Sequence, residues 1–225
     1  MKLTSIFAVL FAAMMFPVDI NASITIDDYS AGTTLTQFGA GTAGQTTTSS
    51  TILGGQRQET LTVTPQGGNE FFGTIGFSGE MDVAQGSQDQ INGGVVYNSF
   101  GTIDFTDGGV NDAFELGFLS SDINAPLTNV VSLEVSSGGT SFSQFVTVPA
   151  NSTLPQNVFV DFATFAAAGV DLTAVDSIAL NFDFAGNPGR DFEIGLFSAT
   201  SSAVPEPTGA LLAIGMLALV YRRKR

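Results

Sequence analysis

The feature that most constrains the fold is a strict alternation of apolar and polar residues, repeated in short runs. In the run from Val131 to Ser136, Val131, Leu133 and Val135 alternate with Ser, Glu and Ser. Other runs place apolar residues at Ile24 and Ile26; Leu61 and Val63; Ile103 and Phe105; Phe114, Leu116 and Phe118; Val158, Val160 and Phe162; Ile178, Leu180, Phe182 and Phe184; and Phe192, Ile194 and Leu196. Because strand side chains point alternately to two faces, each run predicts a strand with one buried face.

Glycine pairs between these runs predict turns, at Gly54-Gly55, Gly67-Gly68, Gly93-Gly94, Gly108-Gly109 and Gly138-Gly139. Short strands at this spacing predict an all-β, antiparallel two-sheet β-sandwich with Phe residues between the sheets. One exception is residues 162–169 (FATFAAAG), where we expect a helical turn across one end of the sandwich. The polar segment 42–51 is compatible with either a strand or a mobile loop.

The first 22 residues have the pattern of a secretory signal peptide. Lys2 precedes an apolar stretch from Ile6 to Phe16, and a turn-prone region ends at Ala22, where we expect cleavage. An N-terminal membrane anchor is disfavoured because the apolar stretch is short and Pro17 interrupts it. We therefore expect the protein to be exported, with a sandwich domain at residues 23–197.

The C-terminal residues 204–225 consist of three consecutive parts after a flexible linker at 198–203. A stiff Val-Pro-Glu-Pro hinge is followed by an apolar run from Gly209 to Tyr221 and by a basic cluster. As a helix the run would span about 20 Å, which is short for a hydrocarbon core of about 30 Å. The positive-inside rule places the basic cluster, Arg222, Arg223, Lys224 and Arg225, in the cytoplasm and the body on the other side of the membrane.

This tail resembles the PEP-CTERM sorting signal of Gram-negative bacteria, with Pro205, Glu206 and Pro207 matching its motif. The resemblance implies that an exosortase, a membrane protease-transpeptidase, recognises the tail. The body would then be anchored transiently in the inner membrane, facing the periplasm, before it reaches the cell surface or extracellular matrix. A generic C-terminal anchor after a Pro-rich linker is the alternative.

The body is also similar, more weakly, to galactose-binding-like jelly rolls, through its opening ITIDDYSAGT and the late GRDFEIGLFSA. That resemblance implies a jelly-roll-like sandwich and brings no ligand-specific motif. The signal helix and the short hydrophobic helix would flank it.

The charge of the body excludes several classes of partner. Of the 21 acidic residues, 19 lie between residues 23 and 203, where Arg57 and Arg190 are the only basic ones, so the body carries a net charge of −17. Nucleic-acid binding needs a basic surface and is therefore excluded, and anionic lipid headgroups would be repelled. The chain has no cysteine, so an exported domain must be held together by core packing or bound ions.

The residue inventory also restricts catalysis. Without His or Cys the chain cannot form a Ser-His triad, a thiol nucleophile or a His-based metal site. Paired-carboxylate chemistry, as in glycosidases, remains, but aromatic platforms are scarce because Trp is absent. We therefore expect a non-catalytic protein and no obligatory cofactor.

Calcium is the one ion that the sequence suggests, and two sets of carboxylates are candidates for binding it. The first is the loop that contains Asp104, Asp107 and Asp112, since oxygen ligands on a flexible loop suit Ca²⁺. The second is an outward ladder of Asp183, Asp191 and Glu193, expected if the strands on either side of the 185–189 turn pair with each other. Asp and Asn are also the usual residues of ordinary turns, and an ordinary turn is the favoured interpretation of the first set.

These observations favour an exported structural or interaction protein of the cell surface or polysaccharide matrix. The alternatives are a carbohydrate-binding module or adhesin, with exopolysaccharide or another surface glycan as partner, and then a glycan-active enzyme. An exposed aromatic pair beside a concave sheet face would favour the module, and a buried carboxylate pair spaced for acid and nucleophile would favour the enzyme.

Overall fold

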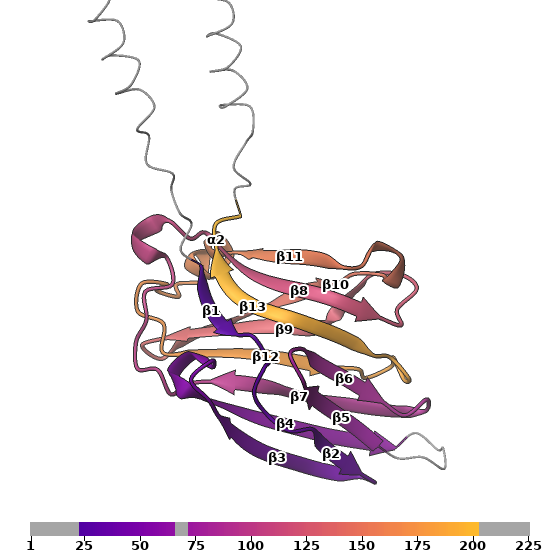
Figure 1. Ribbon diagram of the computed structural model, residues 1–225. Coiled ribbons are helices and arrows are strands. Elements are labelled where there is room, and N and C mark those ends of the chain that lie inside the picture. The colour runs from indigo at the N-terminus through magenta and orange to yellow at the C-terminus, as the bar shows by residue number, and fades with distance from the viewer. Residues whose placement is uncertain (1–22, 66–71, 203–225) are drawn as a thin grey trace, which may run out of the picture.

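The computed structural model describes residues 23–65 and 72–202, which form two antiparallel sheets packed face to face (Figure 1). Sheet A has the strand order β11-β8-β13-β6-β5-β2, with β1 also paired to β13, and sheet B has the order β10-β9-β12-β7-β4-β3. The strands of sheet A are β1 (Ile24–Asp27), β2 (Leu35–Phe38), β5 (Phe72–Phe77), β6 (Met81–Gln85), β8 (Ala113–Ser121), β11 (Gln156–Asp161) and β13 (Phe192–Thr200). Those of sheet B are β3 (Gly41–Thr48), β4 (Gln56–Pro65), β7 (Asp89–Tyr97), β9 (Leu127–Ser137), β10 (Thr140–Val148) and β12 (Ser177–Asp183). The predicted antiparallel, jelly-roll-like sandwich is confirmed.

Helical structure in the described residues is confined to short segments, namely α2 (Phe162–Ala167), η1 (Leu53–Gly55), η2 (Asp107–Gly109) and η3 (Asn151–Thr153). The helical turn expected at 162–169 is α2, and its Phe162 and Phe165 are buried. The strand expected at Ile103 and Phe105 is absent, because Ile103 forms only an isolated bridge with Val175. Phe105 is nevertheless fully buried.

A single core fills the space between the two sheets, and the apolar positions of the alternating runs supply about half of its buried residues. Around Phe114, the rings of Phe105, Phe162 and Phe165 lie with centroids 5.6, 4.7 and 5.7 Å away. The buried core residues lie between Ile26 and Ala199. The body therefore has its own core and is expected to fold without either terminal segment.

The inward orientation predicted for Leu196 is wrong. The register of β13 against β8 shifts between Ile194 and Leu196, so one residue is inserted in the alternation. Leu196 is consequently exposed, while Phe197 and Ala199 point into the core. Gly195 allows this bulge, since a Cβ there would lie 2.7 Å from the Leu119 side chain.

The turn predicted at Gly93-Gly94 is also wrong, because both glycines lie in the middle of β7. A Cβ on Gly93 would lie 2.1 Å from the Thr60 carbonyl oxygen of β4. A Cβ on Gly94 would lie 2.6 Å from the Leu180 carbonyl oxygen of β12. The glycines therefore allow the close approach of backbone on both sides of a central strand.

Replacing Gly93 with alanine is expected to destabilise the body by about 1–3 kcal/mol, the usual cost of forcing extra volume into a packed interior. Urea unfolding of the purified body measures the effect. Gly44→Ala is the matched control, because a Cβ there meets its nearest atom at 3.4 Å and β3 is an edge strand. A loss for Gly93→Ala no greater than that of the control would contradict the assigned contact.

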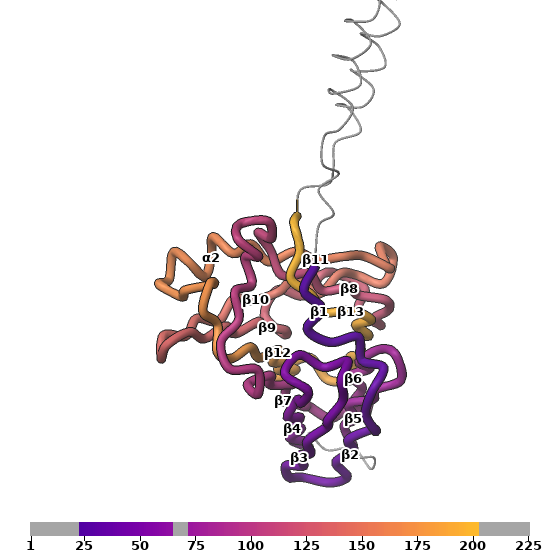
Figure 2. Tube along the Cα trace, turned by 60° about the vertical axis from the view of Figure 1, so that its left-hand side comes forward, coloured from indigo at the N-terminus to yellow at the C-terminus, as the bar shows by residue number. Residues whose placement is uncertain are grey.

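The two ends of the body lie together. β1 pairs antiparallel with β13, with Ile24 opposite Ala199, and the two run side by side in both views (Figures 1 and 2). β13 continues to Thr200, so the sandwich extends into the expected linker at 198–203. Segment 42–51 supplies most of β3, which settles the earlier alternative in favour of a strand.

Candidate functional site

The first predicted calcium ligands are exposed, and two of them accept hydrogen bonds. Asp104 Oδ1 accepts from the Thr106 backbone N–H (2.9 Å) and hydroxyl (2.6 Å), and these bonds hold the pKa of Asp104 below its usual value. Asp107 has a positive φ of 46° at the start of η2. Asp112 Oδ1 accepts from the backbone N–H of Ser202. Asp104 is thus held by its own turn, and Asp112 is held by the C-terminal end of the body.

Within residues 23–65 and 72–202, no three acidic side chains are grouped so that they could hold a metal ion. Calcium binding therefore stays a prediction. Thermal unfolding in millimolar CaCl₂, in EDTA and in NaCl of matched ionic strength tests it. A specific site would raise the midpoint more than the matched NaCl does.

The second predicted set, the ladder of Asp183, Asp191 and Glu193, is wrong. β12 belongs to sheet B and β13 to sheet A, so the turn at 185–189 crosses from one sheet to the other. Phe182 and Phe192 face each other across the core, with centroids 6.4 Å apart. The two strands have the expected inward faces but do not pair, and Asp183 therefore lies on a different sheet from Asp191 and Glu193.

Instead, Asp191 and Glu193 lie near Asp82 of β6, which is directly opposite Glu193 in the register. Partial burial raises the pKa of Asp82, and the negative charges of Glu193, Asp191 and Glu80 raise it further. Burial also raises the pKa of Asp191. Like charges opposite each other destabilise a sheet, so repulsion between these carboxylates lowers the stability of the body at neutral pH.

We expect the ionised carboxylates of Asp82 and Asp191 to destabilise the body at neutral pH, so its stability should increase as the pH is lowered from 7 toward the ordinary carboxyl range. The raised pKa values of Asp82 and Asp191 mean that the folded state binds protons where the unfolded chain has lost them. Their stabilising contribution is therefore complete below the ordinary value of 3.8 and is lost as pH rises through the raised values. Thermal unfolding across this range measures the effect.

Asp82→Asn should raise the melting temperature at pH 7 and weaken its pH dependence. Asp183→Asn, exposed on the other sheet, is the control and should do neither. A melting temperature that falls between pH 7 and pH 5 would contradict the assignment.

A buried ion-pair cluster, not expected from the sequence, lies between the sheets. Arg57 Nη1 donates to Asp27 Oδ2 (2.6 Å), and Arg57 Nε donates to Glu59 Oε1 (2.7 Å). The Tyr97 hydroxyl donates to Asp27 (3.0 Å), and the guanidinium lies 3.6 Å from the centroid of Phe77. Burial raises the pKa of Asp27 although Arg57 opposes the rise, and the Asp27 carboxylate raises the pKa of Arg57 despite its burial.

This cluster cannot act as a glycosidase pair. The side chains of Asp27, Arg57 and Glu59 are fully inaccessible to solvent, and both carboxylates are bound to the same guanidinium. A substrate could not reach them, and neither carboxyl group is available as an acid or nucleophile. The sequence could have indicated this cluster. Arg57 and Glu59 occupy alternate positions that continue the inward-facing row of Leu61 and Val63, so both side chains point into the core.

An open groove follows one edge of the sandwich, where β10 of sheet B and β11 of sheet A are both terminal strands. Two adjoining hollows of about 220 and 430 Å³ form this edge groove. Their lining residues are Gln144, Phe145, Val146, Thr147, Val158, Phe159, Val160, Asp161 and Thr164 for the first, and Pro126, Thr147, Pro149, Thr153, Gln156, Asn157, Val158 and Phe159 for the second.

Two phenylalanines on the edge groove are exposed, Phe145 by 59% and Phe159 by 42%. Phe145 is out of phase with the buried Val146 and Val148, and Phe159 is out of phase with the buried Val160. The groove could have been predicted from this pattern, because each Phe is a large apolar residue at an outward position of an edge strand. Amide and hydroxyl groups lie beside both rings, and Asn157 donates to Glu115.

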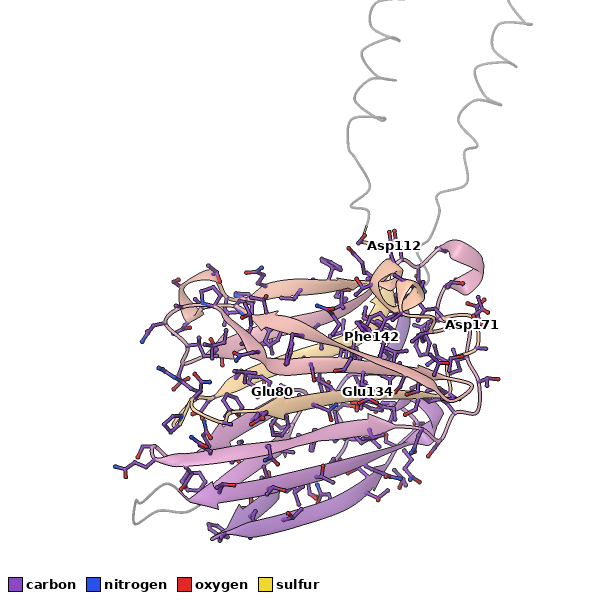
Figure 3. The ribbon with its side chains drawn as sticks, turned by 180° about the vertical axis from the view of Figure 1, so that it is seen from behind. Glu80, Asp112, Glu134, Phe142 and Asp171 are labelled. Carbon is purple, nitrogen blue, oxygen red and sulfur yellow. The ribbon has the colours of Figure 1, made fainter. Side chains whose placement is uncertain are left out.

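A larger hollow of about 650 Å³ adjoins the groove at Asp161 and lies against α2, η2 and residues 170–173. We call it the end cavity. Ala163, Ala166, Val170 and Leu172 contribute apolar surface, and Asp112, Asp161 and Asp171 contribute carboxylates. Asp112 and Asp171 are found near α2, at one end of the sandwich, away from Glu134 (Figure 3).

The predicted sorting residues, Pro205, Glu206 and Pro207 with the basic cluster at 222–225, lie outside the described residues, as does the predicted signal peptide. In the part of the chain that the structure describes, no helix has the length and hydrophobicity needed to cross a bilayer.

Comparisons with known proteins assign no family. No family model matches the chain, and no curated protein matches it. Among solved structures, a family 11 carbohydrate-binding module from Clostridium thermocellum, in complex with a β-1,3-1,4-mixed-linked tetrasaccharide, has a TM-score of 0.41 and 13% identity, covering 80% of this chain and 95% of that one. A family 29 carbohydrate-binding module with mannohexaose has a TM-score of 0.37 and 13% identity, covering 80% and 92%. An exo-β-agarase has a TM-score of 0.39 and 12% identity, covering 83% of this chain and 26% of that one. These similarities are too distant to assign a ligand.

Proposed function

We propose that the protein is an exported, non-catalytic component of the cell surface or extracellular matrix that binds a glycan in the edge groove. The observation that carries the proposal is the pair of exposed rings, Phe145 and Phe159, on the two strands that border one groove. Exposed apolar surface beside polar groups marks an interaction site.

The groove matches the chemistry of a sugar chain. A pyranose ring presents an apolar C–H face, which packs against an aromatic ring, and a rim of hydroxyls, which pair with amides and hydroxyls. Gln144, Gln156 and Asn157 supply the amides, and Thr147 and Thr164 supply hydroxyls. The groove is open along the edge and has no basic residue in its lining, so it suits a chain without acidic groups.

A binding role is favoured over catalysis by the placement of the carboxylates. The buried pair is bound to Arg57, and several of the exposed acids, such as Asp104 and Asp171, accept hydrogen bonds from their own turns. The absence of His and Cys from the sequence removes the other nucleophile and base combinations.

Delivery of the body is proposed to follow from the terminal segments. The signal peptide would export it, and an exosortase would recognise the PEP-CTERM tail and remove it near the hinge. The sequence motifs support this step. Mass spectrometry of the surface-exposed protein tests it, and a mature C-terminus still ending at Arg225 would favour a plain anchor.

Glycan binding is tested on the body, residues 23–202, with an array of neutral polysaccharides followed by titration calorimetry. Phe145→Ala and Phe159→Ala should each weaken binding several-fold, up to about tenfold, since a stacked ring is worth roughly 0.5–1.5 kcal/mol. Phe38→Ala is the matched control, because Phe38 is 77% exposed at the opposite edge of the sandwich.

All three replaced rings are exposed, so the variants are expected to stay folded. No binding to any glycan, or equal losses from Phe38→Ala and the two groove variants, would rule out the edge groove.

A further inference from the structure

We propose that the end cavity binds an amino sugar with a free amine, as one unit of the glycan whose neighbouring units occupy the edge groove. The inference rests on the proposed function and makes it more specific. It begins with the shared position of Asp161, which lines both the end cavity and the adjoining hollow of the groove. A chain lying along β11 would therefore continue into the end cavity.

The cavity contains a buried acceptor that lacks a donor. Asn111 is only 3% exposed, and its Nδ2 donates to the Phe105 carbonyl oxygen (3.2 Å). Its Oδ1 is buried and has no hydrogen-bond partner among the described residues. An unpaired buried acceptor is unfavourable. Because Asn111 belongs to the cavity lining, a small movement of its side chain would bring Oδ1 to an N–H or O–H group of a ligand.

The charges around the cavity favour a cationic ligand. Asp112, Asp161 and Asp171 line it, and its lining contains no Lys or Arg. The two arginines of the body are engaged elsewhere: Arg57 is in the buried cluster, and Arg190 Nη1 donates to the Asp122 carbonyl oxygen. Among the described residues, the cavity lining has no positive charge to offset these carboxylates, so an ammonium group is attracted and an acidic sugar is repelled.

The local turns leave carboxylate oxygens available. Asp171 Oδ1 accepts from the Thr173 backbone N–H (2.9 Å) and hydroxyl (2.7 Å), which fixes the side chain. Asp112 Oδ1 is bound to Ser202. The Oδ2 atoms of both residues have no such bond in the described residues and can accept from a ligand.

The apolar surface distinguishes an amino sugar from a bare ion. Ala163, Ala166, Val170 and Leu172 form much of the lining, and these groups cannot coordinate a metal. A volume of about 650 Å³ lies within the usual range for small-molecule sites and far exceeds that of one ion. A sugar ring carrying an ammonium group satisfies the apolar wall, the carboxylates and the Asn111 acceptor together.

The test compares two β-1,4-linked glucosamine hexamers, one fully N-acetylated and one fully de-N-acetylated, by titration calorimetry with the body at pH 6. We expect the free-amine hexamer to bind about tenfold more tightly or better. Asp161→Asn and Asp171→Asn should each remove most of this preference. Asn can still form the turn at position 171, so the local structure is retained.

The control is Asp183→Asn, an exposed carboxylate on sheet B, which should leave the preference unchanged. Equal affinity of the two hexamers, with Phe159→Ala still weakening both, would overturn this inference and leave the proposed groove intact. A preference that Asp183→Asn reduces as much as Asp171→Asn would show only the general field of an acidic body and would also overturn it. If neither hexamer nor any neutral glycan binds, both proposals fail.

Discussion

Replacing Arg57 with methionine is expected to destabilise the body by about 3–5 kcal/mol, because it leaves the Asp27 and Glu59 carboxylates buried without a counter-charge. Arg57 also donates to the Ala31 carbonyl oxygen, so the variant loses a hydrogen bond between β4 of sheet B and the chain after β1. Urea unfolding followed by circular dichroism measures the change in the free energy of unfolding.

Two further variants make this result specific. Arg190→Met removes the other arginine of the body, which is partly exposed, and should change stability by less than about 0.5 kcal/mol. Combining Arg57→Met with Asp27→Asn and Glu59→Gln removes all three charges and should recover part of the loss. A triple variant less stable than Arg57→Met alone would show that buried charge is not the cause.

Replacing Phe182 with alanine is expected to cost about 3–5 kcal/mol, the usual range for a buried Phe. Phe182 is 2% exposed, and its ring lies 6.4 Å from the rings of both Phe184 and Phe192. It is also directly opposite Gly93 in the register, and this residue has no side chain to fill the space left behind.

Asp183→Ala, one residue further on and exposed, should cost well under about 1 kcal/mol. The comparison isolates the facing of β12, since both variants alter the same strand. Similar losses from the two would mean that the strand is placed with the wrong face inward.

The sequence predicted the fold class well because a strand with one buried face has apolar and polar residues in strict alternation. The same periodicity does not say which sheet a strand joins: β12 and β13 each have an inward row of apolar residues whether the turn at 185–189 returns to the same sheet or crosses to the other. Glycine is ambiguous in a similar way. Gly138-Gly139 forms a turn, whereas Gly93-Gly94 admits neighbouring backbones in mid-strand.

The candidate site was harder to predict because its residues break the pattern that predicts the core. Phe145 and Phe159 occupy outward positions, and a prediction that selects apolar residues at inward positions does not include them. Arg57 was missed for the opposite reason, since it keeps the inward phase but has the wrong polarity. In both cases the disagreement between residue type and phase was present in the sequence.

The position of β13 has a consequence for a body held at its C-terminal end under flow or tension. β13 is an interior strand of sheet A, bonded to β8 along residues 192–200 and also to β1 and β6. Force applied along it would load these lateral hydrogen bonds together in shear, whereas an edge strand peeled from one end would lose them one at a time. A glycan held against β11 would pull on β8 and then on β13, so the load would cross two strand pairings of sheet A.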